Sequence, residues 1–462
     1  MLRAGTAAPQ PRQGDFQRRD RPYYDATVIE LDALVNKTVP FKFNGAELRF
    51  DLSHGLFSSF DVDVGTRLLL KTVARDPRLA AARKVLDAGC GAGIIGLAAA
   101  KAFPEAELSL RDRDSLAVAF SERNRLANKL RGVSAHSDPL TGDRREARPA
   151  PRIGWGLLAD GADGGPYDYI LSNLPAKAGA PVLKAFFAAA GDGSHSLLAP
   201  GGRLAVVIVH TLAEAAEGWI DAAGLVVVDR ARGSMHRAYV LETEGRDSAA
   251  SPAKGWLPHG QGPEFPLEGL DLRPYARTEG RFELGRARYS ARGFWGLPEF
   301  DTPSFGSVAA AELCERVLTG SLVREILLIN PGVGHLALWA LKRLGATGFS
   351  AASRDLLSLG ACAANLAVSG AESYRAFDAL RLDELPPFSR DLVIDSPESI
   401  PGFDWVGLCW KTAAHLVKSG GTYLVASRPT ELVRMDKARP SGWSLLGERR
   451  KRGAAALAWR RN

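Results

Sequence analysis

VLDAGCGAG at residues 85–93 decides the fold, because it joins a strand pattern to a glycine loop and then to a helix pattern. The apolar stretch KVLDA (84–88) predicts a strand, and IIGLAAAKAF (94–103) predicts a helix. Gly89, Gly91 and Gly93 lie between them, and the missing side chains let a ligand approach the backbone and the helix N-terminus. A glycine loop alone is weak evidence of function, so the surrounding segments decide its meaning.

Short apolar strands and helical segments alternate along the chain around this loop. Further strands are predicted at 107–111, 168–172, 203–209 and 225–230, and a second long helix is predicted at 115–130. Alternation at this spacing indicates right-handed βαβ crossovers and a mostly parallel, doubly wound sheet. The predicted fold class is therefore α/β.

Two carboxylates near the loop make a ligand-binding role for it more specific. Asp112 ends the second strand, and in a doubly wound fold this position lies beside the first loop, where a carboxylate can bind ribose hydroxyls. Asp87 stands in an otherwise apolar strand without an evident structural role, and a buried carboxylate needs a partner, which a ligand can supply. A tight turn with helix caps is the alternative interpretation.

With these residues, the chain resembles class I S-adenosylmethionine-dependent methyltransferases over most of residues 41–242. The resemblance implies a Rossmann-like fold and S-adenosylmethionine as the cofactor. It also implies that the D-x-G-x-G-x-G loop holds the methionine and ribose parts, that Asp112 binds the ribose and that Asp138 contacts the adenine amino group. Asp114 is expected to cap the next helix instead. The implied cofactor-binding residues of the loop are Asp87, Gly89, Cys90, Gly91 and Gly93.

The segment upstream of the glycine loop resembles a narrower group within this family. GLFSSFDVDVGTRLLL (55–70) is similar to the signature that precedes the catalytic domain in the two-domain bacterial rRNA guanine-N2 methyltransferases, which contain a methyltransferase small domain. Those proteins also pair an intact domain with a degenerate copy. Their intact copy is C-terminal, whereas the intact copy here is N-terminal. The resemblance therefore implies only kinship with these proteins, because the order of the two domains differs.

The stretch SNLPAKAG (172–179) follows the fourth strand, where amine-methylating relatives carry N-P-P-F or N-P-P-Y. In that motif an Asn oxygen and a backbone carbonyl accept hydrogen bonds from a substrate NH2 group and aim its lone pair at the methyl group. The resemblance therefore implies catalytic roles for Asn173, Leu174 (through its carbonyl) and Pro175, with Asn173 also bordering the cofactor.

The same stretch departs from the motif where an aromatic ring stacks on the substrate. Ala176 stands at that position, and stacking on a ring is worth about 1 to 3 kcal/mol per base. Phe57 or Phe60 is a candidate replacement, although core packing is the stronger expectation for either. Lys177 is expected to meet a substrate phosphate or carboxylate, or else to be a solvated surface lysine.

The chain also contains an internal repeat. When it is shifted by 241 residues, identical residues coincide between 85 and 124, which indicates a domain duplication. The pairs include Gly91 with Gly332, Gly93 with Gly334, Arg113 with Arg354, Asp114 with Asp355 and Asn124 with Asn365.

The second copy lacks the residues that are expected to bind the cofactor and to orient the substrate in the first copy. Leu328, Asn330 and Ser353 align with Asp87, Gly89 and Asp112, and SPES (396–399) aligns with the NLPA tetrad. We therefore expect a pseudo-enzyme domain that packs on the first. The domain prediction is a tail and lead-in at 1–40, the catalytic domain at 41–242, a linker at 243–280 and the degenerate domain at 281–462.

Composition sets the remaining expectations. The 462 residues are 46% hydrophobic and 24% charged, which excludes disorder throughout, collagen and a membrane bundle. The four cysteines are far apart, without a zinc spacing or a disulfide framework, and no metal site is predicted. No signal sequence or apolar stretch near 18 residues is found, so a cytoplasmic protein without a membrane partner is expected.

The sequence therefore predicts methyl transfer to an amine nitrogen, and the expected acceptor is an exocyclic base amine of structured RNA such as rRNA guanine. RNA is the expected partner, and the net charge of +7 is compatible with it. Two alternatives stay open: methylation of a small molecule or protein, and a cofactor- or RNA-binding module without turnover. The oligomeric state is open, and a monomer fits because the duplication supplies an internal partner domain.

Overall fold

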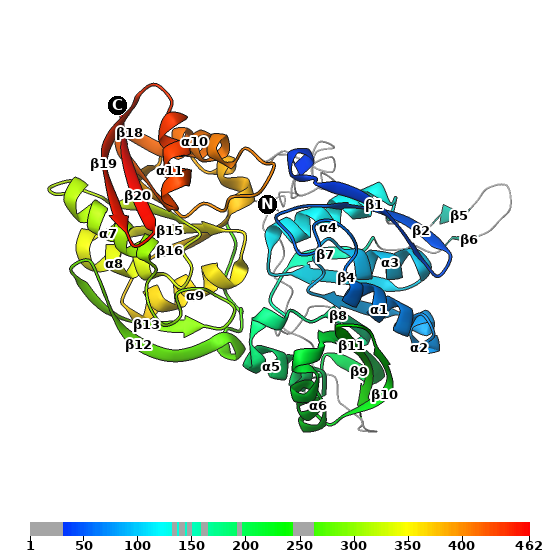
Figure 1. Cartoon of the computed structure of the whole chain (residues 1–462). Coiled ribbons are helices and arrows are strands. Elements are labelled where there is room, and N and C mark those ends of the chain that lie inside the picture. Colours follow the sequence, from blue (N-terminus) through cyan, green and yellow to red (C-terminus); the bar gives the residue numbers. More distant parts are fainter. Residues whose placement is uncertain are drawn as a thin grey trace, which may run out of the picture.

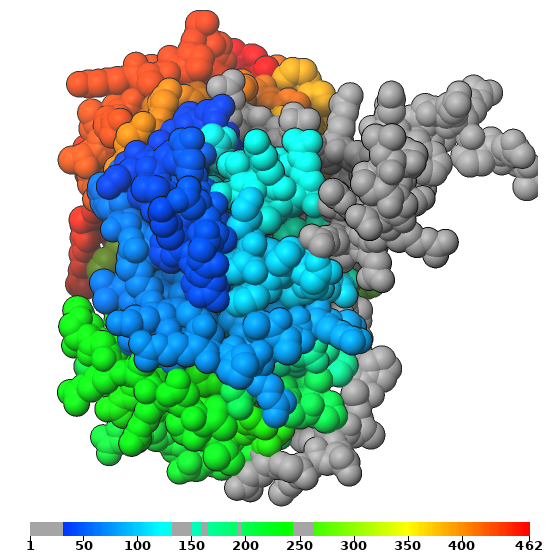
Figure 2. All heavy atoms as spheres, turned by 90° about the vertical axis from the view of Figure 1, so that its right-hand side faces the viewer, coloured from blue at the N-terminus to red at the C-terminus, as the bar shows by residue number. Residues whose placement is uncertain are grey.

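The computed structural model describes residues 31–131, 136–137, 144–145, 150–158, 165–191, 196–243 and 263–462, and no side chains at 136–137 and 144–145. Asp138, the predicted adenine contact, lies outside the described residues. Two halves lie side by side, the first blue to green and the second yellow-green to red (Figure 1). Figure 2 faces the first half, with its N-terminal segment in dark blue lying against the lighter blue and cyan segments.

The first half is built on a seven-stranded sheet. In spatial order its strands are β10 (Leu225–Arg232), β11 (His236–Thr243), β9 (Leu198–Val209), β8 (Tyr167–Asn173), β3 (Lys84–Ala88), β4 (Glu107–Asp112) and β7 (Arg152–Trp155). The five strands from β9 to β7 are parallel, whereas β11 is antiparallel to both of its neighbours. This arrangement confirms the predicted α/β class and mostly parallel sheet. The antiparallel strand β11 was not among the predicted strands.

Helices cover both faces of this sheet because its apolar residues alternate in direction. Val85 packs in the core with α1 and α3, and its neighbour Leu86 packs in the core with α5 and α6. The helices of the first half are α1 (Val64–Val73), α2 (Pro77–Ala81), α3 (Ile94–Ala102), α4 (Ser115–Ala127), α5 (Ala180–Gly191) and α6 (Ala213–Ala222).

The second half repeats this strand order. Its sheet runs β16 (Tyr374–Asp378), β15 (Gly348–Ser353), β14 (Glu325–Ile329), β17 (Arg390–Asp395), β18 (Val417–Ser427), β20 (Ala454–Arg461) and β19 (Trp443–Lys451). Its helices are α7 (Phe305–Val317), α8 (His335–Leu344), α9 (Leu356–Val368), α10 (Trp405–Leu416) and α11 (Pro429–Lys437). Two sheets with one strand order agree with the internal repeat of the sequence.

A β-hairpin precedes the first helix of each half. β1 (Lys37–Phe43) pairs with β2 (Ala46–Leu52), and β12 (Ala276–Leu284) pairs with β13 (Ala287–Phe294). Short elements complete the described part: β5 (His136–Ser137), β6 (Arg144–Arg145) and 3-10 helices at Leu31–Leu34, Ala176–Ala178, His210–Leu212, Arg273–Tyr275 and Ala379–Glu384.

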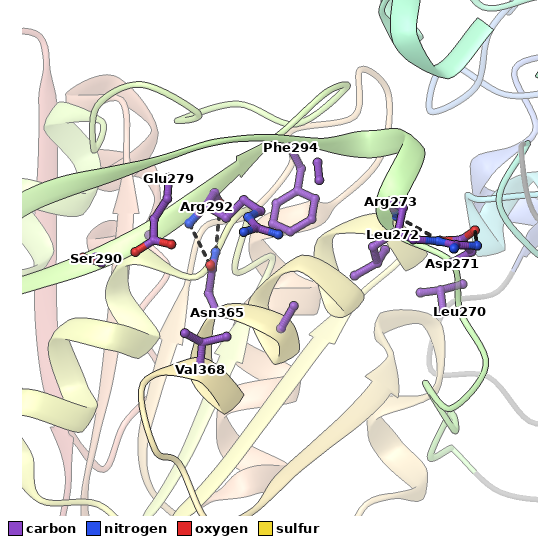
Figure 3. Close-up of a pocket in the computed structure, with 13 residues that line it drawn as sticks. Leu270, Asp271, Leu272, Arg273, Glu279, Ser290, Arg292, Phe294, Asn365 and Val368 are labelled. Carbon is purple, nitrogen blue, oxygen red and sulfur yellow. Dashed lines mark hydrogen bonds and ion pairs between the residues drawn. The ribbon is translucent and has the colours of Figure 1, made fainter. Parts of the chain in front are cut away.

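One repeated asparagine ties each hairpin to a helix that follows it, α4 in the first half and α9 in the second. In the first half Asn124 accepts a hydrogen bond from Asp51 N at 2.8 Å and donates to Asp51 O and Ala92 O at 3.1 and 2.9 Å. In the second half Asn365 accepts from Arg292 N at 2.8 Å and donates to Arg292 O at 3.0 Å, beside a surface cavity of about 640 Å³ (Figure 3). Asn124 and Asn365 therefore occupy equivalent places in the two halves.

The part of the predicted linker that the structure describes is ordered against both halves. Phe265 is buried, with its ring centroid 4.8 Å from that of Trp155, and β12 already begins at Ala276. One buried apolar cluster also includes Phe186 of α5 and Phe294 of β13. The two halves thus share a continuous apolar core.

Candidate active site

The glycine loop after β3 has the conformation that its sequence predicts. Gly89, Gly91 and Gly93 have φ angles of 77°, 55° and 81°, in the left-handed region that favours glycine. A Cβ added to Gly89 or Gly91 would meet no atom within 4 Å, so the loop borders open space. At Gly93 an added Cβ would lie 2.9 Å from Leu97 and Ser121 side-chain atoms, so this glycine is also needed for packing.

Asp87 is fully buried and only half satisfied. Its Oδ2 accepts a hydrogen bond from Gly96 N at 2.7 Å, whereas Oδ1 has no hydrogen-bond partner in the described part of the chain. Burial raises the pKa of Asp87 to about 7. Asp87 therefore has a structural role that the sequence did not reveal, because it bonds the backbone of α3.

Asp112, at the end of β4, is oriented by two backbone donors. Gly91 N donates to Oδ2 and Asp114 N donates to Oδ1, both at 2.9 Å. Burial nevertheless raises its pKa. Asp114 caps α4 by accepting a hydrogen bond from Leu116 N at 2.9 Å, as expected. The carboxylate predicted to bind ribose thus touches the glycine loop directly.

Asn173 ends β8, beside β3, and two upstream side chains hold its amide. Its Nδ2 donates to Asp63 Oδ2 at 3.0 Å and to Thr66 Oγ1 at 3.1 Å. Because both amide hydrogens are engaged, Oδ1 is the group left to accept a hydrogen bond. Asp63 and Thr66 were missed as site residues, although both lie in the DVGT stretch that carries the upstream resemblance.

The residues that follow Asn173 leave the sheet and become exposed. Leu174 is buried, and its N–H donates to Val207 O at 3.0 Å, which fastens the segment to β9. Pro175, Ala176 and Lys177 are exposed, so all three side chains are accessible to a large substrate.

The aromatic candidates upstream are exposed as well. Phe57 and Phe60 are 72% and 63% exposed, so the expectation that either packs in the core is wrong. The ring of Phe60 lies 4.9 Å from that of His54 in an edge-on arrangement. Both residues lie in the loop between β2 and α1, and most of each side chain is exposed in the described part of the chain.

Cys90 lies in the glycine loop and is buried. Its Sγ is 3.4 Å from Ser121 Oγ, and burial raises the pKa of its thiol. A raised pKa keeps the thiol protonated, which fits packing and not catalysis. In the described part of the chain, no group of three or more His, Cys, Asp and Glu residues is placed to hold a metal ion.

The equivalent loop of the second half is filled by a side chain. Asn330 has a φ of 57°, as Gly89 has a positive φ, but its Nδ2 donates to Ser396 O at 3.1 Å. Its Oδ1 accepts from Ser353 Oγ at 3.2 Å. The Asn330 side chain therefore spans the strand ends where the first half leaves open space.

The comparisons with known proteins centre on the first half. Residues 47–217 match the family model of the methyltransferase small domain. The ribosomal RNA small subunit methyltransferase C of Pasteurella multocida (strain Pm70) is 41% identical over 92 residues, 20% of this chain and 27% of that protein. The ribosomal RNA large subunit methyltransferase G of Streptomyces coelicolor is 32% identical over 158 residues, 33% of this chain and 35% of that protein. The chain spans about a third of the length of the curated relatives that it matches.

One solved structure matches both halves. It is the T. thermophilus 16S rRNA N2 G1207 methyltransferase (RsmC) in complex with AdoMet and guanosine, with a TM-score of 0.58 and 19% identity. The match covers 93% of this chain and 99% of that chain, so the tandem arrangement of two Rossmann-like domains is shared. Residues 47–217 are therefore a class I methyltransferase domain of the methyltransferase small family, within a two-domain fold like that of the rRNA guanine-N2 methyltransferases.

Proposed function

We propose that this chain transfers a methyl group from S-adenosylmethionine to an exocyclic amine of structured RNA, such as the N2 amine of an rRNA guanine. The orientation of Asn173 carries the proposal. Asp63 and Thr66 engage both hydrogens of its amide, so Oδ1 is presented to accept an N–H of the acceptor amine.

The described residues fit the cofactor. The open space beside Gly89 and Gly91 admits a ligand close to the backbone, and the unpartnered Oδ1 of Asp87 can accept a ligand N–H. Asp112 has lone pairs left for ribose hydroxyls after its two backbone bonds. When bound, S-adenosylmethionine supplies a methyl group that its positively charged sulfur makes electrophilic. Asp138 remains a proposed adenine contact.

The chain's own contribution to the reaction is orientation. Asn173 Oδ1 and the Leu174 carbonyl accept hydrogen bonds from the acceptor NH2 group, and the Leu174 N–H bond to Val207 O holds that carbonyl in place. Two such bonds direct the nitrogen lone pair away from the protein and toward the methyl group. Holding reactants in line is among the largest contributions that positioning residues make to rate.

An RNA substrate is favoured by two exposed rings in the segment that precedes Asp63. Phe57 and Phe60 offer rings on which a base can stack. They would replace the aromatic residue that relatives carry at the position of Ala176. The names of the relatives with rRNA substrates support the same class.

The test is calorimetric titration with S-adenosylhomocysteine, followed by a methyl-transfer assay with labelled S-adenosylmethionine and ribosomal RNA. One site per chain is expected, lost in Asp112→Ala and kept in Ser353→Ala, the control at the equivalent position of the second half. Nuclease digestion of the product is expected to yield N2-methylguanosine. Equal affinity in Asp112→Ala and wild type would contradict the site, and methylation confined to a small molecule or protein would overturn the RNA substrate.

A further inference from the structure

The two domains meet at their second strand-to-helix corners. Ser115 N donates to Arg354 O, and Leu356 N donates to Arg113 O, both at 2.9 Å. These bonds lie on either side of an antiparallel bridge between Asp114 and Asp355, so the two corners form a short ladder.

Each corner arginine reaches into the other domain. The Arg113 guanidinium lies 3.2 Å from Asp355 and donates to Gly296 O at 3.1 Å. The Arg354 guanidinium lies 3.8 Å from Asp114, and a Cβ on Gly55 would lie 3.3 Å from its Nη1. Gly55 and Gly296 are separated by 241 residues, as Arg113 and Arg354 are. The contact therefore has a pseudo-two-fold symmetry that follows the internal repeat.

The two arginines contact different surroundings in the opposite domain, so the pseudo-two-fold symmetry of the contact is incomplete. Arg113 contacts the second domain, where the cofactor carboxylates are replaced by Leu328 and Ser353. Arg354 pairs with Asp114 of the first domain, whose N–H holds Asp112, and its Nη1 lies beside Gly55, which precedes Phe57 in the same loop.

The surroundings of Arg354 keep it in place. Its side chain is only 16% exposed, and Nη2 also bonds Glu398 at 2.5 Å. Beside it, Ser115 Oγ donates to Asp378 Oδ1 of the second domain at 2.7 Å in a buried contact. The guanidinium thus balances carboxylates from both domains next to the cofactor loop.

We propose that Arg354 of the degenerate domain is a positioning residue for the active site of the first domain. It holds the corner that carries Asp112 and the start of the Gly55 loop, so the second domain completes a site that it does not itself contain. This inference rests on the proposed function.

Removing the guanidinium leaves Asp114 and Glu398 without their cation, close to Asp112. Repulsion among these carboxylates is expected to displace Asp114, whose N–H orients Asp112. We expect about a tenfold loss of S-adenosylhomocysteine affinity and a raised KM for RNA, with kcat changed less than twofold, since Asn173 is untouched.

The experiment compares full-length Arg354→Ala, Arg354→Lys and Asp355→Asn by calorimetry, steady-state kinetics and thermal unfolding. Asp355→Asn is the matched control, because it breaks the mirror-image ion pair while asparagine still caps α9. The affinity is expected to fall in Arg354→Ala, to recover partly in Arg354→Lys and to stay within twofold in Asp355→Asn. Arg354→Gln, which keeps most of the side chain but removes its charge, serves if Arg354→Ala does not fold.

Equal losses in the Arg354→Ala and Asp355→Asn variants would reduce the contact to general interface stability and overturn the proposal. An unchanged affinity in both Arg354→Ala and Arg354→Gln would overturn it as well. Failure of the proposed function is separable: in that case Asp112→Ala does not weaken binding either, whereas failure of this inference alone leaves the Asp112→Ala effect intact.

Discussion

At the scale of single residues, the site depends on groups that are held by neighbours distant in sequence. Asn173 presents Oδ1 because Asp63 and Thr66 occupy its amide hydrogens. Without these two acceptors the amide can rotate by half a turn and present its hydrogens to the substrate, which would repel an incoming N–H donor.

Removing one acceptor of Asn173 is therefore expected to lower turnover without affecting the cofactor. Thr66→Val keeps the shape of the side chain and the Asp63 cap but removes Oγ1, and we expect kcat to fall about tenfold. Asn173→Ala removes the acceptor itself, which typically costs about 10²- to 10³-fold. Calorimetry with S-adenosylhomocysteine is the control, and a matching loss of affinity would place Asn173 in cofactor binding only.

Asp87 predicts a pH dependence of stability. Burial raises its pKa to about 7, above the value near 4 of an unfolded aspartate. A raised pKa in the folded state means that the stabilisation is complete below pH 4 and is lost as pH rises toward 7. We expect the cofactor-free Tm to fall between pH 5 and pH 8 more in wild type than in Asp87→Asn. Because other buried carboxyls titrate too, the difference between the two proteins is the quantity to compare; identical profiles would contradict an ionisable Asp87.

At the scale of elements, the hairpin, the first loop and α4 act as one unit. Asn124 joins them through three hydrogen bonds to Asp51 and Ala92 backbone groups. Ala92 belongs to the glycine loop, so the hairpin is coupled to the cofactor site through a single amide.

Asn124→Ala is expected to destabilise the chain. An unpaired buried polar group costs about 1 to 3 kcal/mol, and this substitution leaves three backbone groups without their partner. Urea unfolding checks the loss, with Asn365→Ala as the matched change in the second domain. Only the Asn124 variant is expected to weaken S-adenosylhomocysteine binding as well, and equal binding effects would contradict the coupling to the loop.

At the scale of the whole molecule, the pairing of basic side chains determines which of them are available to the proposed RNA partner. Several C-terminal cations are already paired: Arg449 and Lys451 bond Glu312 at 2.5 and 2.8 Å, and Arg450 bonds Glu448 at 2.5 Å. These pairs engage cations of β19 with carboxylates of the chain itself, so these cations are less available to RNA phosphates. No helix in the described ranges is both long and apolar enough to cross a bilayer.

Binding to an rRNA fragment is expected to weaken steeply as salt rises, because contacts to phosphates release counterions. Fluorescence anisotropy at several salt concentrations gives the slope. The variant with both Arg449→Gln and Lys451→Gln is expected to keep it, since these cations are engaged by Glu312. A slope smaller by about two in that variant would place β19 in the RNA interface.

The fold and the cofactor loop could be predicted because their signals are local. Alternating apolar residues and three glycines within nine positions determine β3, the loop and α3, and a carboxylate after the next strand follows from the geometry of parallel sheets. The repeat at a shift of 241 residues likewise predicted a second domain, and its sheet has the same strand order as the first.

Local sequence patterns thus predicted the two α/β sheets and the position of Asp112 beside the loop, and both are confirmed. The loss of chemistry in the second copy stays a prediction. The bonds of Asp63 and Thr66 to Asn173, the exposure of Phe57 and the ion pair between Arg354 and Asp114 follow from the tertiary structure alone. These contacts join residues separated by about 110 to 240 positions, and no local pattern of side chains encodes which distant partner a hydrogen bond or ion pair will meet.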